Sequence, residues 1–197
     1  MRRLTATDRR TTIIEAAVRI FSERGFRGTK TRELARAARI SEALLFRHFP
    51  DKQALYQAIL AHKMNERLPA LLGIPPSGPP EKVLAGLAVT IARQNEDDPM
   101  LMRLLLYSAL EGHELSDLFF RRRTLPLLEF LKKYFSERMT AGAFRRQDPE
   151  TAARGFLAMI FGFLQTRLLF RMRGALRLPL NKTLAGLVAI FLEGLKK

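Results

Sequence analysis

The sequence of 197 residues contains no cysteine and only three histidines. Without cysteine the chain can form neither a disulfide nor a thiol redox sensor, which agrees with a reducing cytoplasm. The histidines, His48, His62 and His113, are far apart in the sequence and do not have the spacing of a metal site. We therefore expect a cytoplasmic protein with no metal and no cofactor.

The chain also lacks an apolar run long enough to cross a membrane. The longest strongly apolar run, residues 155–165, lies between Arg154 and Arg167 and is shorter than the roughly 20 residues that a spanning helix needs. The basic start of the chain is not followed by an apolar segment, so it does not read as a secretory signal. We expect a soluble protein with no membrane partner.

Catalytic patterns are missing as well. The sequence shows no nucleophile with a base and an orienting group at plausible positions, and no glycine-rich phosphate loop. Residues 111–114, Glu-Gly-His-Glu, resemble an acid–base cluster only superficially. We therefore expect that the protein is not an enzyme, and a helical enzyme is the weakest alternative.

No strand-like alternation and no internal repeat is present, whereas apolar residues recur at helical spacing along the whole chain. The first helix is expected at about residues 6–24. Further helices are expected between Thr29 and Ser41, after Ser41, and over about 51–72, 81–96, 99–112, 114–140, 149–172 and 182–194. Pro126 should kink or split the helix that contains it. The predicted fold class is all-α.

The charge is strongly one-sided. The chain carries 34 Lys and Arg against 19 Asp and Glu, a net charge of +15. The excess is densest at the N-terminal end, where residues 1–52 hold 13 basic and 6 acidic side chains. A polyanion such as DNA fits this distribution, although a solvated basic surface would produce the same composition.

Residues 29–56 have the pattern of two short helices joined by a tight connection, with a third helix directly after them. Thr29, Ser41 and Asp51 are each placed to cap one of these helices through a side-chain oxygen. Small alanines in the first helix allow the second to cross it closely. In the second helix Leu45, Phe46 and Phe49 are expected to be buried. The outward face and the end of the helix are then left to Ser41, Glu42, Ala43, Leu44, Arg47 and His48.

The segment from about Arg10 to Tyr56 resembles the DNA-binding domain of the TetR family of bacterial transcriptional regulators. The matching residues are Ile14-Glu15-Ala16-Ala17, Phe21, Gly25-Phe26, Gly28-Thr29, Glu33-Leu34-Ala35, Ala38, Ile40-Ser41, His48-Phe49, Lys52 and Leu55. The resemblance implies a three-helix DNA-binding domain with a helix-turn-helix, followed by a larger helical ligand-binding and dimerisation domain. We place these domains at residues 1–56 and 57–197.

Three positions depart from the family pattern. Arg39 stands where the turn usually has glycine, Leu44 where a small or hydroxylic residue is frequent, and Phe46 where a phosphate-binding tyrosine is common. If Arg39 has a positive φ, its side chain costs roughly 1 kcal/mol relative to glycine. Because Phe46 has no hydroxyl group, we expect it in the core and not on DNA.

The predicted DNA contacts gather at the starts of these helices and on the outward face of the second. They are Thr29, Lys30, Thr31, Arg32, Ser41, Glu42, Ala43, Leu44, Arg47, His48 and Lys52. The residues around the first helix start, together with Lys52, are expected to hold phosphates.

Several of these residues keep two interpretations. Ser41 either caps its helix or binds phosphate, and Arg47 reaches guanine or phosphate. Glu42 either accepts a hydrogen bond from N4 of cytosine or stabilises the N-terminus of its helix by its negative charge, and we prefer the second interpretation. His48 donates to phosphate or caps the helix end, and Ala43 and Leu44 offer contact to a thymine methyl group. A basic arm of Arg2, Arg3, Arg9 and Arg10 could reach the minor groove.

A ligand site is expected in the second domain. The predicted residues are Met102, Tyr107, Glu111, Phe120, Phe163 and Gln165. The apolar members supply adaptable surface for a hydrophobic ligand and the polar members would orient it. For each apolar residue, plain core packing is the alternative.

Small residues at helical spacing mark the last two long helices. Gly155, Ala158, Gly162, Ala185 and Ala189 would let helices approach closely. We expect a two-fold interface in which each subunit gives two helices to a four-helix bundle, and an internal helix pair is the alternative. A dimer would place two reading helices about one DNA turn apart, roughly 34–36 Å, as a palindrome requires.

The resemblance to the TetR family implies a homodimeric repressor that a small hydrophobic ligand releases from a palindromic operator in double-stranded DNA. The alternative is a basic protein that coats nucleic acid without sequence preference. The operator sequence, the ligand and the sign of regulation are left open by the sequence.

Overall fold

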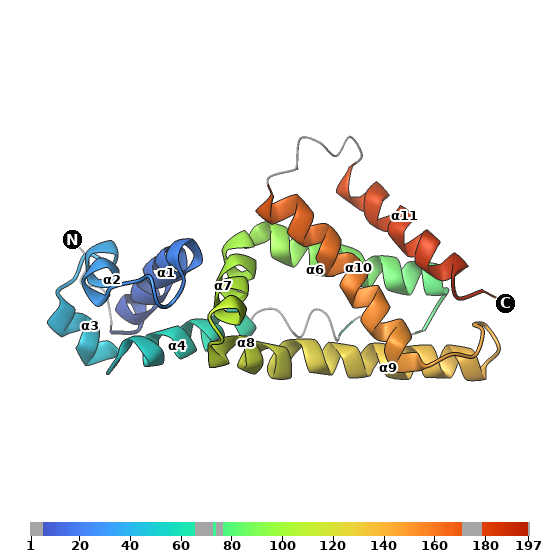
Figure 1. The fold of residues 1–197 in the computed structure, drawn as a ribbon, viewed down its shortest axis with the longest axis horizontal. Coiled ribbons are helices and arrows are strands. Elements are labelled where there is room, and N and C mark those ends of the chain that lie inside the picture. The colour runs from blue at the N-terminus through green and yellow to red at the C-terminus, as the bar shows by residue number, and fades with distance from the viewer. Residues whose placement is uncertain (1–5, 66–72, 74–76, 171–178, 197) are drawn as a thin grey trace. The chain divides into compact units, whose positions relative to one another are not determined.

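The computed structural model describes residues 6–65, 73, 77–170 and 179–196, and within these ranges it contains helices and no strand. Contacts divide the chain into two compact units, residues 1–66 with 99–120 (unit 1) and residues 67–98 with 121–197 (unit 2). Figure 1 labels the helices of both units. The predicted all-α class is confirmed.

Unit 1 combines the N-terminal helices with a helical pair from the middle of the chain. Its helices are α1 (Ala6–Arg24), α2 (Thr31–Ala37), α3 (Glu42–His48), α4 (Lys52–Asn65), α7 (Pro99–Leu110) and α8 (Glu114–Phe119). α1 packs against α2, α4 and α7, so it lies at the centre of the unit. One apolar core joins all six helices and includes Phe21, Leu34, Leu45, Tyr56, Leu104 and Leu115.

Unit 2 is built from longer helices. They are α6 (Pro80–Asp97), α9 (Leu125–Thr140), α10 (Pro149–Leu169) and α11 (Leu180–Glu193). α10 packs against α9 and α6, and α11 packs against α6 and α10. Their buried stripes supply a second core that includes Leu87, Ile91, Leu131, Phe135, Phe156, Ile160 and Leu184.

The predicted helices are confirmed apart from small shifts at their ends. Pro126 splits the predicted helix 114–140 as expected, because α9 begins at Leu125 and places the proline in its first turn. A π-helical turn, η1 (Phe120–Thr124), separates α8 from α9. The expected ends of two helices, residues 66–72 and 171–172, lie outside the described residues.

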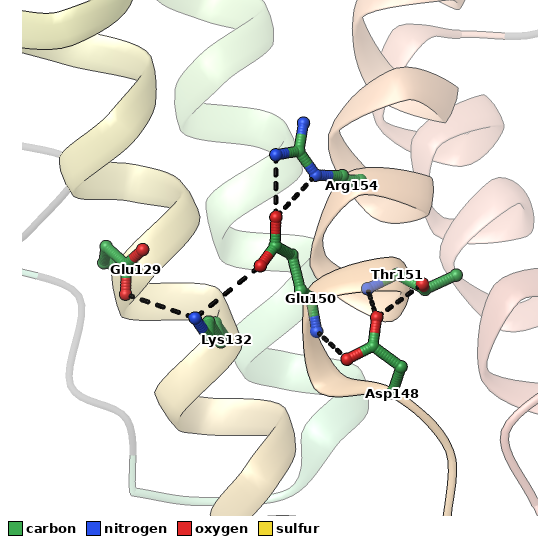
Figure 2. Close-up of polar contacts among 6 residues, drawn as sticks. All are labelled: Glu129, Lys132, Asp148, Glu150, Thr151 and Arg154. Atoms are coloured by element: carbon green, nitrogen blue, oxygen red, sulfur yellow. Dashed lines mark hydrogen bonds and ion pairs between the residues drawn. The ribbon is translucent and has the colours of Figure 1, made fainter.

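The start of α10 is held by a polar network, shown in Figure 2. Asp148 caps the helix by accepting from the backbone N–H of Thr151 at 2.8 Å and from its hydroxyl at 2.6 Å. One oxygen of Glu150 accepts from Arg154 at 2.7 Å, and the other lies 3.6 Å from the Lys132 ammonium group on α9. The network therefore joins the first turn of α10 to α9.

Within the described part of the chain, no helix is both long and apolar enough to cross a membrane.

Candidate nucleic-acid interface

The connection between α2 and α3 has the geometry of a tight helix-turn-helix. The N–H of Arg39 donates to the carbonyl of Arg36 at 3.1 Å, and the N–H of Ile40 donates to that of Ala35 at 3.0 Å. These two bonds form a Schellman motif, which ends a helix through one left-handed residue. That residue is Arg39, with φ 55, so the condition under which its side chain has a steric cost is met.

α2 begins one residue later than predicted, and Thr29 does not cap it. Lys30 occupies the N-cap position, and Glu33 accepts from its N–H at 3.0 Å. Thr29 is only 2% exposed, and its hydroxyl donates to the carbonyl of Gly25 at 2.7 Å. The predicted cap is wrong because Thr29 lies in the preceding turn, where a buried carbonyl is closer than the first N–H groups of α2.

Lys52 was expected to reach phosphate from the start of α4. Its ammonium group instead donates to the carbonyl of Phe26 at 2.8 Å and to that of Thr29 at 3.0 Å. It also lies 4.2 Å from the centroid of the Phe26 ring. Burial lowers the pKa of Lys52, partly offset by the charge of Glu111. These contacts give Lys52 the role of joining α4 to the α1–α2 connection.

α3 presents a mixed outward face. Ser41 caps the helix by accepting from the N–H of Leu44 at 3.1 Å, as predicted. Glu42, Ala43 and Arg47 are exposed, and Leu44 and His48 are half-buried. Glu42 also accepts from the hydroxyl of Thr31 at 3.3 Å, which links the starts of α2 and α3.

Phe46 is 42% exposed, so the prediction that it belongs to the core is wrong. Leu45 and Phe49, one helical turn apart, are the residues that α3 buries. Phe46 follows Leu45 by one residue, which turns it about 100° around the helix axis and away from that core. It therefore lies on the exposed side with Arg47.

The end of α3 is closed by a residue of α1. Arg10 donates to the carbonyl of His48 at 2.9 Å, and its guanidinium lies 4.2 Å from the centroid of the Phe49 ring. Burial lowers the pKa of His48, and the charges of Arg47, Arg10 and Arg9 act in the same direction. Arg10 thus has a role inside unit 1, while Arg2 and Arg3 lie outside the described residues.

Six of the predicted DNA-binding residues line one open hollow on unit 1. They are Thr29, Lys30, Thr31, Arg32, Glu42 and Lys52. Lys30 and Arg32 are exposed, while Thr29 and Lys52 are held by the internal hydrogen bonds described above. The hollow lies where the start of α2 meets the start of α3.

Two of the residues predicted to orient a ligand, Tyr107 and Glu111, fasten the end of α7 to the end of α1, and their role in ligand binding stays a prediction. Glu111 accepts from the N–H groups of Phe26 at 2.9 Å and Arg27 at 3.1 Å. The hydroxyl of Tyr107 donates to the carbonyl of Glu23 at 3.1 Å. Sequence reasoning missed these contacts, because the partners are more than 80 residues apart in the chain and no local pattern marks them.

His113 completes this junction. Its ring lies 4.4 Å from the Phe26 ring and 4.8 Å from the Tyr56 ring, measured between centroids. One ring nitrogen accepts from the N–H of Leu115 at 3.2 Å, and the other lies 2.8 Å from the side-chain oxygen of Gln53. Burial lowers the pKa of His113. α7 and α8 are therefore attached to the helices that carry the hollow.

The remaining predicted ligand residues fall in different surroundings. Met102 is buried in unit 1, and Phe120, the last residue of that unit, is 44% exposed. Phe163 and Gln165 are half-buried on α10 in unit 2. Their proposed role in ligand binding stays a prediction.

Two family profiles match this chain. The profile of bacterial regulatory proteins of the tetR family matches residues 13–59. The profile of the AefR-like transcriptional repressor C-terminal domain matches residues 82–194, which is more than half of the chain.

Individual proteins agree with the profiles. The uncharacterized HTH-type transcriptional regulator YvkB of Bacillus subtilis (strain 168) is 26% identical over 185 residues, or 93% of this chain and 95% of YvkB. The crystal structure of AibR with isovaleryl coenzyme A and operator DNA is 26% identical, has a TM-score of 0.72, and covers 92% of this chain and 97% of AibR. The fold is shared with FadR of Bacillus subtilis, solved with stearoyl-CoA, at a TM-score of 0.75 and 16% identity over 94% of this chain and 98% of FadR. The chain belongs to the TetR family of bacterial transcriptional regulators.

Proposed function

We propose that the protein is a homodimeric repressor that binds a palindromic operator through α2 and α3 and acts in the bacterial cytoplasm. The observation that carries this proposal is the helix-turn-helix of unit 1, with an exposed α3 face of Glu42, Ala43, Phe46 and Arg47 beside the basic start of α2. The second helix of such a motif enters the major groove.

The exposed residues divide into two kinds of contact. Lys30 and Arg32 are charged and exposed, and they lie at the start of α2 and not on the outward face of α3. We therefore assign them to phosphates. Arg47 and Ala43 lie on the outward face of α3 and are assigned to base edges. Thr29 and Lys52 are assigned to the support of this surface, because their side chains are bonded inside unit 1.

The dimer is proposed to form through α10 and α11. Gly155, Ala158, Gly162, Ala185 and Ala189 are all exposed in the single chain. Ile190, beside them on α11, is 71% exposed. A strip of small and apolar residues open to water is the surface that a close helix–helix contact between subunits would cover.

The effector is proposed to be a small ligand with an apolar acyl part. The support is AibR, at 26% identity, whose structure contains isovaleryl coenzyme A. Such a ligand releases DNA only if it binds the DNA-free form of the dimer more tightly than the bound form. Isovaleryl coenzyme A should then weaken operator binding, whereas free coenzyme A should not.

The experiment that tests the function is selection of bound sequences from a pool of random duplexes at near-physiological salt. A regulator of this kind should enrich one palindrome with half-sites about one helical turn apart. A protein that coats nucleic acid without preference would bind tightly at low salt and enrich nothing. That second result would contradict the proposal.

A further inference from the structure

The turn between α2 and α3 holds Arg39 in a left-handed conformation. With φ 55, it is the one non-glycine residue of the described chain with a positive φ. Side chains are disfavoured in this conformation because Cβ approaches the following carbonyl oxygen. The two backbone bonds of the Schellman motif leave the residue no other conformation.

The same motif ends two other helices of this chain, and there the left-handed residue is glycine. At the end of α7, Gly112 has φ 64 and the N–H of His113 donates to the carbonyl of Ser108 at 2.8 Å. At the end of α9, Gly142 has φ 75 and the N–H of Ala143 donates to that of Arg138 at 3.0 Å. Glycine meets the requirement without a steric cost. Among the described helix ends with a left-handed residue, the helix-turn-helix is the one that has a side chain at this position.

Within the described protein, only the two backbone bonds hold this conformation, and the side chain of Arg39 adds no contact that would favour it. Arg39 is exposed, and among the described residues its guanidinium has no hydrogen-bond or ion-pair partner. Strain kept at one position without an internal contact points to an external use of the side chain.

The position of Arg39 indicates that use. It precedes Ser41, the cap of α3, by two residues, and Glu42 and Ala43 at the start of α3 are exposed. Because the first residues of a recognition helix meet base edges in the major groove, a residue just ahead of them lies near the phosphates that border it. Arginine is long, permanently charged and matched to phosphate oxygens.

We infer that Arg39 binds a phosphate of the operator backbone and raises affinity without reading sequence. This inference rests on the proposed DNA-binding function. The phosphate contact explains why an arginine stands at a position where any side chain lowers the stability of the folded protein.

The test compares four variants for binding to the selected operator and to a random-sequence duplex, across a range of salt concentrations. Arg39→Gly removes both the charge and the Cβ atom that causes the strain. Arg39→Ala removes the charged part of the side chain but keeps Cβ, and Arg39→Lys keeps the charge. Arg93→Ala is the matched control, because Arg93 is an exposed arginine of α6 in unit 2. Thermal melting of each variant is recorded in parallel.

Arg39→Gly should melt at a higher temperature than the wild type and yet bind operator about tenfold more weakly, as expected for loss of one charged hydrogen bond. Its slope of log affinity against log salt should be shallower by about 0.9. Arg39→Ala should lose the same affinity without the gain in melting temperature. Arg39→Lys should retain the salt slope, and Arg93→Ala should match the wild type.

An unchanged salt slope and unchanged affinity in both Arg39→Gly and Arg39→Ala would overturn the inference. The random duplex separates this failure from failure of the proposed function. If the wild type prefers no sequence, the proposed function fails, but the slope of Arg39→Gly on random duplex still decides whether Arg39 contacts phosphate.

Discussion

At the scale of single residues, the charged side chains near α2 and α3 have two different roles, since some support the fold of unit 1 and others remain exposed. Lys52 and Glu111 both bond to backbone groups of the α1–α2 connection: Lys52 donates to carbonyl groups and Glu111 accepts from N–H groups. Lys30 and Arg32 remain exposed. Sequence alone could not separate these roles, since all four appear as polar residues at helix ends.

Glu111→Ala should destabilise the protein, because it leaves the N–H groups of Phe26 and Arg27 without their acceptor. Loss of a charged acceptor of two backbone donors should lower the free energy of unfolding by about 1–3 kcal/mol. Urea denaturation measures the change. Glu15→Ala, at an exposed site of α1, is the control. Equal stability of the two variants would show that Glu111 does not fasten α7.

His113 should make stability depend on pH. Its pKa is lowered in the folded protein, chiefly by burial, with Lys52 acting in the same direction and Glu114 and Glu111 opposing. The unfolded chain therefore binds the proton more readily, and stability falls as the pH drops below about 6.5, the ordinary histidine value. His113→Asn can still accept from Leu115, and should lose less stability between about pH 7 and 5. Parallel urea titrations at these pH values would contradict the account if both proteins lose the same amount.

At the scale of helices, periodicity predicted nearly every element, because amphipathic spacing is a local property of the sequence. The wrong predictions have different causes. Thr29 was expected to cap a helix, but its hydroxyl donates to the carbonyl of Gly25 in the preceding turn. Phe46 was placed in the core, although Leu45 and Phe49 already fill the buried face of α3. The packing of α7 against α1 and of α8 against α4 was not predicted, because it joins segments far apart in the chain.

The cap of α10 gives a prediction at this scale. Asp148 accepts from two atoms of Thr151, and these bonds lower the pKa of its carboxyl group. Asp148→Ala should lower the melting temperature, and Asp148→Asn, which retains an acceptor at the cap, should lower it less. Below the ordinary aspartate pKa the wild type should lose this advantage, because protonation removes the charged acceptor. An alanine variant that melts like the wild type at neutral pH would contradict this role.

At the scale of the whole molecule, binding of a palindromic operator requires a dimer of two chains. An exposed strip on α10 and α11 was predicted from small residues at helical spacing, and exposure of all five residues supports it. Which ligand the protein binds could not be predicted, because adaptable apolar residues serve core and pocket equally well.

Gly162→Leu should weaken the dimer. A Cβ atom added at the exposed Gly162 would have no neighbouring atom within 4 Å in its own chain, so the subunit should still fold. In the proposed interface, however, the added bulk would separate the two subunits. Gly86→Leu is the matched control, since Gly86 is also an exposed helical glycine with nothing within 4 Å. Sedimentation should show a dimer for the wild type and the control, and a shift toward monomer for Gly162→Leu.

The central claim is sequence-specific binding, and the most direct measurement is the ratio of affinities for the selected operator and a shuffled duplex of equal length at near-physiological salt. The account predicts a preference of about 10³-fold or more for the operator. It also predicts that Arg47→Ala reduces this preference while the protein remains folded. Equal affinities of the wild type for both duplexes would contradict the account.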